Sequence, residues 1–267
     1  MLISIIANSK RHDFLANMLG KDGHQVIHHT TLKDIPDRIF GQLIILPIPT
    51  TRPDGSLNID GNTSGIKADE IVSRTDENAT IIGCNYATDM RHFIDINTFE
   101  PFCFMNAVPS AEGAILTAMQ NCNTTLYQSK CLVIGYGRIG KLIADRMSAF
   151  CADTSITARN PKDIYLARSL GHSVLKYENL ADSVYQFDII FQTVPKLILD
   201  RHILSKTKND CVIIELASKG VGTDLDFAKD SGLNVIYAPA IPEKYSPISA
   251  GKIFYDSVIN ILDEFDI

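Results

Sequence analysis

Three glycines in the middle of the chain have the spacing of a phosphate-binding turn. The apolar segment Cys131–Ile134 runs directly into Gly135-Tyr136-Gly137-Arg138-Ile139-Gly140, and a helix-like segment follows at 141–147. In such a motif the first glycine permits a tight turn, the second lets the backbone approach a pyrophosphate, and the third lets the helix pack closely on the strand. We therefore predict that Gly135, Gly137, Arg138, Ile139 and Gly140 bind a dinucleotide. The alternative is a glycine-rich turn without a ligand.

The residue after the next expected strand bears on the choice between NAD and NADP. This strand is predicted at Thr154–Ala158, and Arg159 and Asn160 follow it. NAD-selective sites usually have Asp or Glu there, which accepts hydrogen bonds from the ribose 2′-hydroxyl, whereas a guanidinium suits a 2′-phosphate. We predict that Arg159 and Asn160 bind NADP. NAD stays open as the cofactor if Arg159 only stacks on adenine or lies in solvent.

Two more strand ends should line the same crevice, because ligands of parallel sheets bind outside the carboxyl ends of the strands. Strands predicted at 188–193 and 211–216 end in Thr193-Val194-Pro195 and in Leu216-Ala217-Ser218-Lys219. Thr193, Val194, Pro195, Ala217 and Ser218 are candidate cofactor contacts, and Lys219 is a candidate partner of a substrate carboxylate. The competing interpretations are an ordinary strand end stopped by proline and a solvated lysine.

A second group of candidates precedes the glycine motif, in the segment 106–113, Asn-Ala-Val-Pro-Ser-Ala-Glu-Gly. We expect a helix from Ala111 to about Asn121 with Ser110 as its N-cap, so that the N–H groups of Ala111, Glu112 and Gly113 form an anion site for a substrate carboxylate. Glu112 is the candidate general base, and Asn106 and Ser110 complete the candidate catalytic group. Capping alone by Ser110, and stabilisation of the helix dipole by Glu112, are the alternatives.

The elements that carry these residues alternate between short apolar strands and helices, which predicts an α/β fold with parallel sheets. Further strands are expected at 1–7, 25–29, 43–47, 80–84 and 102–104. We predict two domains. Residues 1–122 with 245–267 form an N-terminal, Rossmann-like α/β domain for substrate or partner, completed by a C-terminal helix at about 250–265, and residues 123–244 form a Rossmann dinucleotide-binding domain. In the first domain, Arg52 on the long loop 47–65 is a candidate substrate contact.

Composition narrows the class of protein. The chain has 267 residues, 45% of them hydrophobic, and a formal net charge of −6 without a basic stripe, which argues against a nucleic-acid partner. No apolar run approaches the roughly 20 residues that span a bilayer. The six cysteines form no C-x-x-C pair, so we expect reduced thiols, no metal site and a cytoplasmic location.

From about Asn106 to Phe265 the chain resembles the dipicolinate synthase family, in its nicotinamide-binding, A-type subunit. The segment 106–113 and the glycine motif carry the resemblance, together with Thr193-Val194-Pro195, Leu216-Ala217-Ser218, Gly222-Thr223-Asp224, Ala238-Pro239 with Pro242, and Ser249-Ala250-Gly251-Lys252. There are two departures. Glu215 stands where the family usually has Asp, and 240–243 lacks two glycines that the family often has.

The resemblance implies an oxidoreductase subunit that forms dipicolinate, pyridine-2,6-dicarboxylate, from the product of dihydrodipicolinate synthase. It implies removal of two electrons by a nicotinamide cofactor, a small dicarboxylate substrate, a flavoprotein-like partner (the B-type subunit of dipicolinate synthase), and a place in the mother cell of a sporulating bacterium. Two alternatives remain open: an NAD(P)-dependent dehydrogenase of another small amino or hydroxy acid, and a non-catalytic NADPH sensor. The seven histidines offer no clear catalyst, which weakens the hydroxy-acid alternative. A homo-oligomer is also left open.

Overall fold

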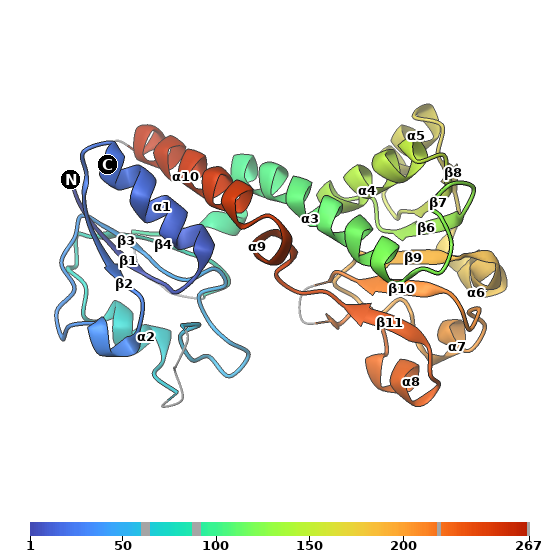
Figure 1. The fold of residues 1–267 in the computed structure, drawn as a ribbon, viewed down its shortest axis with the longest axis horizontal. Coiled ribbons are helices and arrows are strands. Elements are labelled where there is room, and N and C mark those ends of the chain that lie inside the picture. The colour runs from blue at the N-terminus through green and yellow to red at the C-terminus, as the bar shows by residue number, and fades with distance from the viewer. Residues whose placement is uncertain (60–64, 87–91, 218–219, 266–267) are drawn as a thin grey trace. The chain divides into compact units, whose positions relative to one another are not determined.

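The computed structural model describes residues 1–59, 65–86, 92–217 and 220–265. The chain divides into two compact units (Figure 1): Met1–Asn106 with Ser246–Ile267, and Ala107–Tyr245. The first boundary falls inside the helix α3 (Glu100–Asn121), whereas we predict a domain boundary after residue 122 from the sequence.

The first unit is built on a five-stranded parallel sheet with the order β2-β1-β3-β4-β5. Helices α1 and α10 lie side by side in this unit (Figure 1). The bounds of its elements are β1 Leu2–Ile6, α1 Lys10–Lys21, β2 Gln25–His29, η1 Leu32–Asp34, β3 Leu43–Ile45, α2 Ala68–Val72, β4 Thr80–Gly83, β5 Phe93–Asp95, η2 Ile96–Thr98 and α10 Pro247–Glu264.

Helix α10, at the end of the chain, completes the core of this unit. A Cβ atom at Gly251 would lie 2.6 Å from Phe14 Cβ, so only glycine lets α10 approach α1 this closely. The apolar face of α10 contributes Phe254, Val258 and Ile261 to a cluster that contains strand residues from β1, β3 and β4. The predicted completion of the N-terminal α/β fold by the C-terminal helix is therefore confirmed.

The second unit is a six-stranded parallel sheet with the order β11-β10-β9-β6-β7-β8. This is the strand order of a Rossmann fold, and its topological switch point lies between β6 and β9. The bounds of its elements are β6 Lys130–Ile134, α4 Arg138–Ala149, β7 Asp153–Thr157, α5 Pro161–Ser169, β8 Ser173–Val174, η3 Tyr177–Asn179, α6 Leu180–Ser183, η4 Val184–Gln186, β9 Ile189–Gln192, α7 Arg201–Leu204, β10 Val212–Glu215, α8 Leu225–Asp230, β11 Asn234–Tyr237 and α9 Ile241–Tyr245.

Both faces of this second sheet are buried, because successive side chains of a strand point to opposite faces. Cys131 and Val133 of β6 join one apolar cluster, and Leu132 and Ile134 join another. The central strands β6, β9 and β10 consequently consist largely of apolar residues, as in parallel sheets with helices on both sides. The predicted α/β fold with two parallel sheets is confirmed.

Helix α3 differs from the prediction in three ways. It begins at Glu100 rather than near Ala111, it contains Pro109, and it absorbs residues 102–104, which were expected to be a strand. Its buried face is formed by Ala107, Ala111, Ala114, Ile115 and Ala118, whereas the apolar side chains of Leu116 and Met119 are 40% and 52% exposed. Proline and serine usually mark the start of a helix, but here the buried side chains on both sides of Pro109 extend the helix through it.

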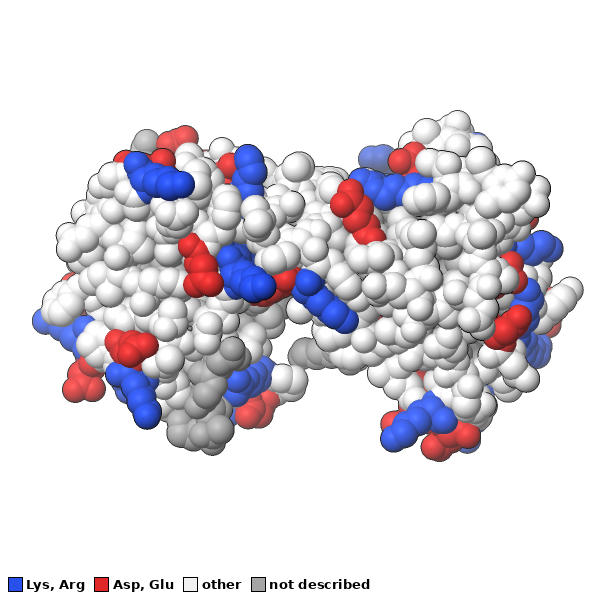
Figure 2. Space-filling model, in the orientation of Figure 1, with Lys and Arg blue, Asp and Glu red and all other residues white. Residues whose placement is uncertain are grey.

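Acidic and basic side chains are mixed on the surface. On the face drawn in Figure 2, blue and red groups alternate on each unit, and the cations do not gather into a stripe there. None of the helices within the described residues is long and apolar enough to cross a membrane.

Candidate functional site

Two of the three motif glycines are required by close contacts within the second unit. Gly135 has a φ of +97°, and a Cβ atom there would lie 2.5 Å from Thr193 Oγ1. A Cβ atom at Gly140 would lie 2.2 Å from the carbonyl oxygen of Gly135, closer than real Cβ contacts come. Gly135 therefore forms the turn, and Gly140 lets the first turn of α4 pack against that turn.

Gly137 is different, because a Cβ atom there would meet no atom of the chain within 4 Å. Its backbone is extended, with a φ of −78°, so another residue could adopt it without strain. Gly137 is the N-cap of the 12-residue helix α4 and gives it no side-chain cap. The first N–H groups of a helix have no partner within it and favour anions, so open space beside them fits a pyrophosphate.

Arg159 follows β7, and its side chain is held by an aromatic ring. The guanidinium carbon lies 5.5 Å from the centroid of Tyr177, and Arg159 is exposed. Asn160 is the N-cap of α5, where its side chain accepts a hydrogen bond of 2.9 Å from the N–H of Lys162. The guanidinium of Arg159 therefore lies over a ring of the chain itself, and the side-chain oxygen of Asn160 caps the start of α5.

The carboxyl ends of the strands form one row across the sheet. The strand pairing places five residues next to one another along this row, in the order Thr157, Ile134, Gln192, Glu215 and Tyr237. The predicted segment Thr193-Val194-Pro195 leaves the row at β9, next to the switch point, and the Thr193 hydroxyl donates a 2.8 Å hydrogen bond to the carbonyl of Ile134. Ala217 leaves the row at β10, whereas the predicted residues Ser218 and Lys219 lie outside the described residues.

Two buried polar residues in this row were missed by the sequence analysis as site residues. Gln192 and Glu215 are both 0% exposed. Burial raises the pKa of the Glu215 carboxyl, while hydrogen bonds from the Thr223 hydroxyl and the Ala217 N–H act in the opposite direction. The available signal was a polar residue at the end of each apolar strand, since a buried polar side chain must find hydrogen-bond partners.

The predicted anion site at the start of a helix does not exist. Since α3 begins at Glu100, Ser110 is not an N-cap, and the N–H groups of Ala111, Glu112 and Gly113 lie in the interior of the helix. The prediction was wrong because it placed the helix start at Pro109-Ser110. Asn106 belongs to the same helix, in the part assigned to the first unit.

Glu112 and Gly113 have structural partners in the second unit. The Glu112 side chain is 57% exposed, and its Oε1 lies 3.5 Å from Nη2 of Arg146 on α4, so Glu112 forms an ion pair at the surface. A Cβ atom at Gly113 would lie 2.3 Å from Ile241 Cγ2 and 2.9 Å from Tyr245 Cδ2. The glycine therefore allows α3 and α9 to pack closely.

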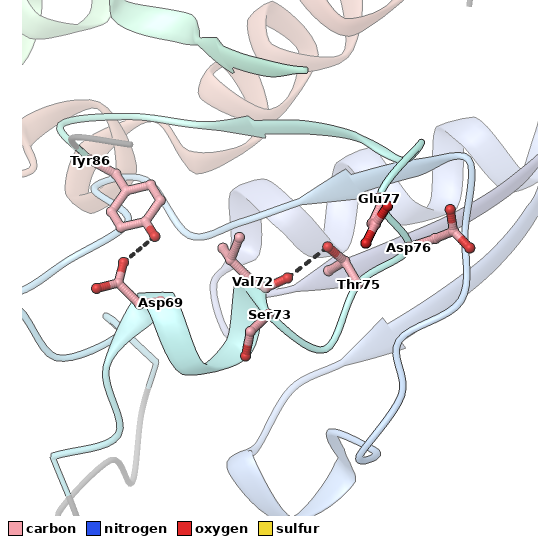
Figure 3. Close-up of a pocket in the computed structure, with 7 residues that line it drawn as sticks. All are labelled: Asp69, Val72, Ser73, Thr75, Asp76, Glu77 and Tyr86. Atoms are coloured by element: carbon pink, nitrogen blue, oxygen red, sulfur yellow. Dashed lines mark hydrogen bonds between the residues drawn. The ribbon is translucent and has the colours of Figure 1, made fainter. Parts of the chain in front are cut away.

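In the first unit, Arg52 stabilises its own loop. Its guanidinium donates a 2.8 Å hydrogen bond to the carbonyl of Ile59, and its backbone N–H donates a hydrogen bond to the carbonyl of Ser56. A depression in the same unit (Figure 3) is lined by α2 and the segment after it, and Asp69 there accepts a hydrogen bond from the Tyr86 hydroxyl. Asp76 and Glu77 also line it, so three carboxylates oppose an anionic substrate.

The fold and the glycine turn are those of a dinucleotide-binding domain, in a chain of two parallel α/β units. Residues 110–224 match the family described as "D-isomer specific 2-hydroxyacid dehydrogenase, NAD binding domain". These findings support a dehydrogenase-type oxidoreductase that uses a nicotinamide cofactor.

Within this class, the chain is similar to the A-type subunit of dipicolinate synthase from Bacillus subtilis (strain 168), with 27% identity over 230 residues, 83% of this chain and 77% of that protein. The solved structure of the same subunit from Bacillus halodurans superposes with a TM-score of 0.88 at 22% identity, over 98% of this chain and 97% of the other. The corresponding solved structure from Bacillus subtilis gives 0.85 at 22% identity, over 100% and 97%. The two structures show the shared fold, and the resemblance seen in the motifs is confirmed.

Proposed function

We propose that this chain is the nicotinamide-binding subunit of a dipicolinate-forming oxidoreductase, with NADP as the electron acceptor. The observation that carries the proposal is the similarity to a dipicolinate synthase subunit over 83% of the chain. In the proposed reaction, dihydrodipicolinate loses a hydride to the cofactor and a proton to a base, which gives aromatic dipicolinate, the reduced cofactor and one proton. A second, flavoprotein-like subunit and a role in the mother cell of a sporulating bacterium are parts of the same proposal.

The residues of the second unit fit the cofactor. When bound, the nicotinamide ring would supply the hydride acceptor. The space beside Gly137 and the first N–H groups of α4 would hold the pyrophosphate, while Gly135 and Gly140 shape the turn. Thr193, Val194 and Pro195 would border the nicotinamide half, because they leave β9 beside the switch point, where ligands of this fold bind.

The geometry of Arg159 supports the choice of NADP. A guanidinium offers several N–H groups that match the oxygens of a phosphate. That of Arg159 is exposed, and its carbon lies 5.5 Å from the centroid of the Tyr177 ring, a cation–π contact that holds it at the end of β7. Residues 158–160 include no Asp or Glu that would accept hydrogen bonds from a ribose 2′-hydroxyl.

For the substrate, the proposal rests on the sequence motif alone. Asn106, Ser110 and Glu112 are the proposed catalytic residues, with Glu112 as the proton acceptor, and Lys219 and Arg52 are the proposed carboxylate partners. Glu112 is accessible and paired with Arg146, so a change of either residue should alter proton removal.

The test is turnover of freshly generated dihydrodipicolinate with NADP, followed by the ultraviolet absorbance of the pyridine product, with and without the flavoprotein-like second subunit. Glu112→Gln should lower turnover while nicotinamide binding stays intact. No product from the intact chain with that second subunit present would refute the proposed function. D-2-hydroxy acids are tested in parallel by the absorbance of the reduced cofactor, because the match of residues 110–224 to a 2-hydroxyacid dehydrogenase domain favours them as the second candidate substrates.

Cofactor choice is tested separately, by titrating the chain with NADPH and NADH and following nicotinamide fluorescence. Arg159→Asp should abolish the preference for NADPH. Equal affinities of the unchanged chain for the two cofactors would refute the assignment of Arg159.

A further inference from the structure

Two buried side chains at the carboxyl ends of neighbouring strands in the second sheet connect the loops that leave these strands. Gln192 ends β9 and Glu215 ends β10, and the two residues are partners in the ladder between these strands. Residues paired in register on parallel strands point to the same face of a sheet. Both side chains are 0% exposed, although each strand is otherwise apolar.

Gln192 uses both ends of its amide to hold backbone groups. Its Oε1 accepts a 3.0 Å hydrogen bond from the N–H of Val194, and its Nε2 donates a 2.9 Å hydrogen bond to the carbonyl of Gly222. The same carbonyl accepts the N–H groups of Ile198 and Leu199, each at 3.0 Å. The amide of Gln192 thus ties the segment after β9 to the segment that leads into α8.

The fit around this amide leaves no room for a larger residue opposite it. A Cβ atom at Gly222 would lie 2.6 Å from Cγ and from Nε2 of Gln192. Since Gln192 is fully buried, it cannot rotate into solvent to relieve such a contact. Gly222 and Gln192 therefore fit each other as a pair.

Glu215 holds the neighbouring loop in the same manner. Its Oε1 accepts a 2.7 Å hydrogen bond from the N–H of Ala217, and its Oε2 accepts a 2.5 Å hydrogen bond from the Thr223 hydroxyl. Ala217 and Thr223 are 4% exposed each, so these donors have no access to water as an alternative. The carboxyl fixes both the exit from β10 and the residue that follows Gly222.

From this geometry we infer that Gln192 and Glu215 are positioning residues for the nicotinamide half of the cofactor: they fix the segment 193–195 and the backbone at Ala217 and Gly222–Thr223 at the carboxyl ends of β9 and β10. This inference rests on the proposed function, because it assumes that a nicotinamide dinucleotide binds at the switch point. The adenine half would lie by β7 and would not depend on these contacts, since ligands span the switch point in this fold.

The experiment compares NADH with ADP-ribose, which lacks the nicotinamide ring, in titrations of the full chain by calorimetry. The variants are Gln192→Leu and Glu215→Leu, which remove the hydrogen bonds, and Glu215→Gln, whose amide can accept from Ala217 and donate to the Thr223 oxygen. We expect NADH to bind about tenfold more weakly to the two leucine variants, a factor that equals about 1.4 kcal/mol. ADP-ribose should bind all variants as it binds the unchanged chain, and Glu215→Gln should restore NADH binding.

Thr223→Val and Thr223→Ser form a milder matched pair, in case the leucine variants do not fold. The valine variant lacks the hydroxyl that donates to Glu215 and should lose NADH affinity, whereas the serine variant should keep it. NADH affinity unchanged in Thr223→Val and in the leucine variants that fold would overturn the inference, and so would equal losses for NADH and ADP-ribose, which indicate a general structural role. An unchanged chain that binds neither NADH nor NADPH would refute the cofactor assignment itself and, with it, the inference.

Discussion

The contrast between Gly137 and Gly140 gives the sharpest test of the nucleotide site. At Gly140 an alanine Cβ would lie 2.2 Å from the backbone oxygen of Gly135 and 3.0 Å from its carbonyl carbon, and backbone atoms cannot rotate away. Forcing an extra methyl into a packed site costs about 1–3 kcal/mol, and a contact with backbone belongs at the upper end of this range. With about 2–4 °C of melting temperature per kcal/mol for a domain of this size, Gly140→Ala should melt about 6–12 °C lower.

At Gly137 the same substitution meets no atom within 4 Å, and the backbone conformation suits alanine. Alanine is a less favourable N-cap residue than glycine, which lowers stability, but it also lowers the conformational entropy of the unfolded variant, which raises stability. Because the two effects oppose each other, the free energy of unfolding should change by less than about 1 kcal/mol. The new methyl would, however, occupy the space proposed for the pyrophosphate. We expect NADH affinity to fall at least about tenfold, or about 1.4 kcal/mol.

Thermal unfolding followed by circular dichroism and NADH titration by fluorescence measure the two effects on the same preparations. The reasoning requires that Gly140→Ala loses stability and that Gly137→Ala loses binding alone. A Gly137→Ala variant with normal stability and normal NADH affinity would refute the assignment of the pyrophosphate site. A Gly140→Ala variant with an unchanged melting temperature would refute the packing argument.

Four further predictions concern single residues. Tyr177→Leu should weaken NADPH binding by a factor of about 2 to 5, since a cation–π contact at an exposed site contributes about 0.5–1 kcal/mol. NADH binding should stay the same. Equal effects in the two titrations would contradict the proposal that the Tyr177 ring positions Arg159 for the 2′-phosphate. Gly113→Ala should destabilise the second unit by about 1–3 kcal/mol in urea unfolding, because the alanine Cβ would contact Ile241 and Tyr245. A second substitution in the same chain, Ile241→Ala, should recover part of the lost stability. No recovery would show that the contact with Ile241 is not the cause. Burial lowers the pKa of His12 from 6.5 to about 3, so between these pH values the unfolded chain binds a proton that the folded chain does not. The free energy of unfolding should therefore fall by about 1.4 kcal/mol per pH unit as the pH drops below 6.5. His12→Gln should remove this slope, and a slope that persists would assign it to other groups. Burial raises the pKa of Glu215 above 4.5, so the folded chain keeps a proton that the unfolded chain has already released. The free energy of unfolding should therefore fall as the pH rises from 4.5 through the raised pKa of the folded chain. In urea unfolding, Glu215→Gln should lack this decrease, and a pH profile identical to that of the unchanged chain would contradict the prediction.

The residues that could be predicted from the sequence are those whose requirements are local. The positive φ at Gly135 and the close approach of Gly140 to Gly135 lie within one short motif, and the apolar runs of β6, β9 and β10 mark these strands directly. The contact of Gly135 with Thr193, by contrast, joins two distant segments. Arg159 was found in the same way, because its position at the end of a strand is a matter of spacing. Its partner Tyr177 was not, since β8 and the turns around it bring the ring back to the end of β7.

The remaining features depend on contacts between distant segments. Pro109 and Ser110 have the local character of a helix start, and only packing on both sides of them extends α3 back to Glu100. Gln192 and Glu215 become neighbours through the register of β9 with β10, and their partners Gly222 and Thr223 come from a third segment. The close packing of α3 on α9 at Gly113 has the same origin, since it joins residues more than 120 positions apart. Spacing along the chain carries no information about such pairings.

The place of α10 in the chain also sets an order of events during synthesis. The first unit needs Phe254, Val258 and Ile261 for its core, yet these residues leave the ribosome after the whole of the second unit. At about 5–20 residues per second, the 155 residues from Ala107 to Ile261 take about 8–31 s. During that interval the apolar side chains of α1 have no covering helix, whereas the second unit is continuous in sequence and can fold as soon as it emerges. The nascent N-terminal half is therefore the part of this chain on which a chaperone would act.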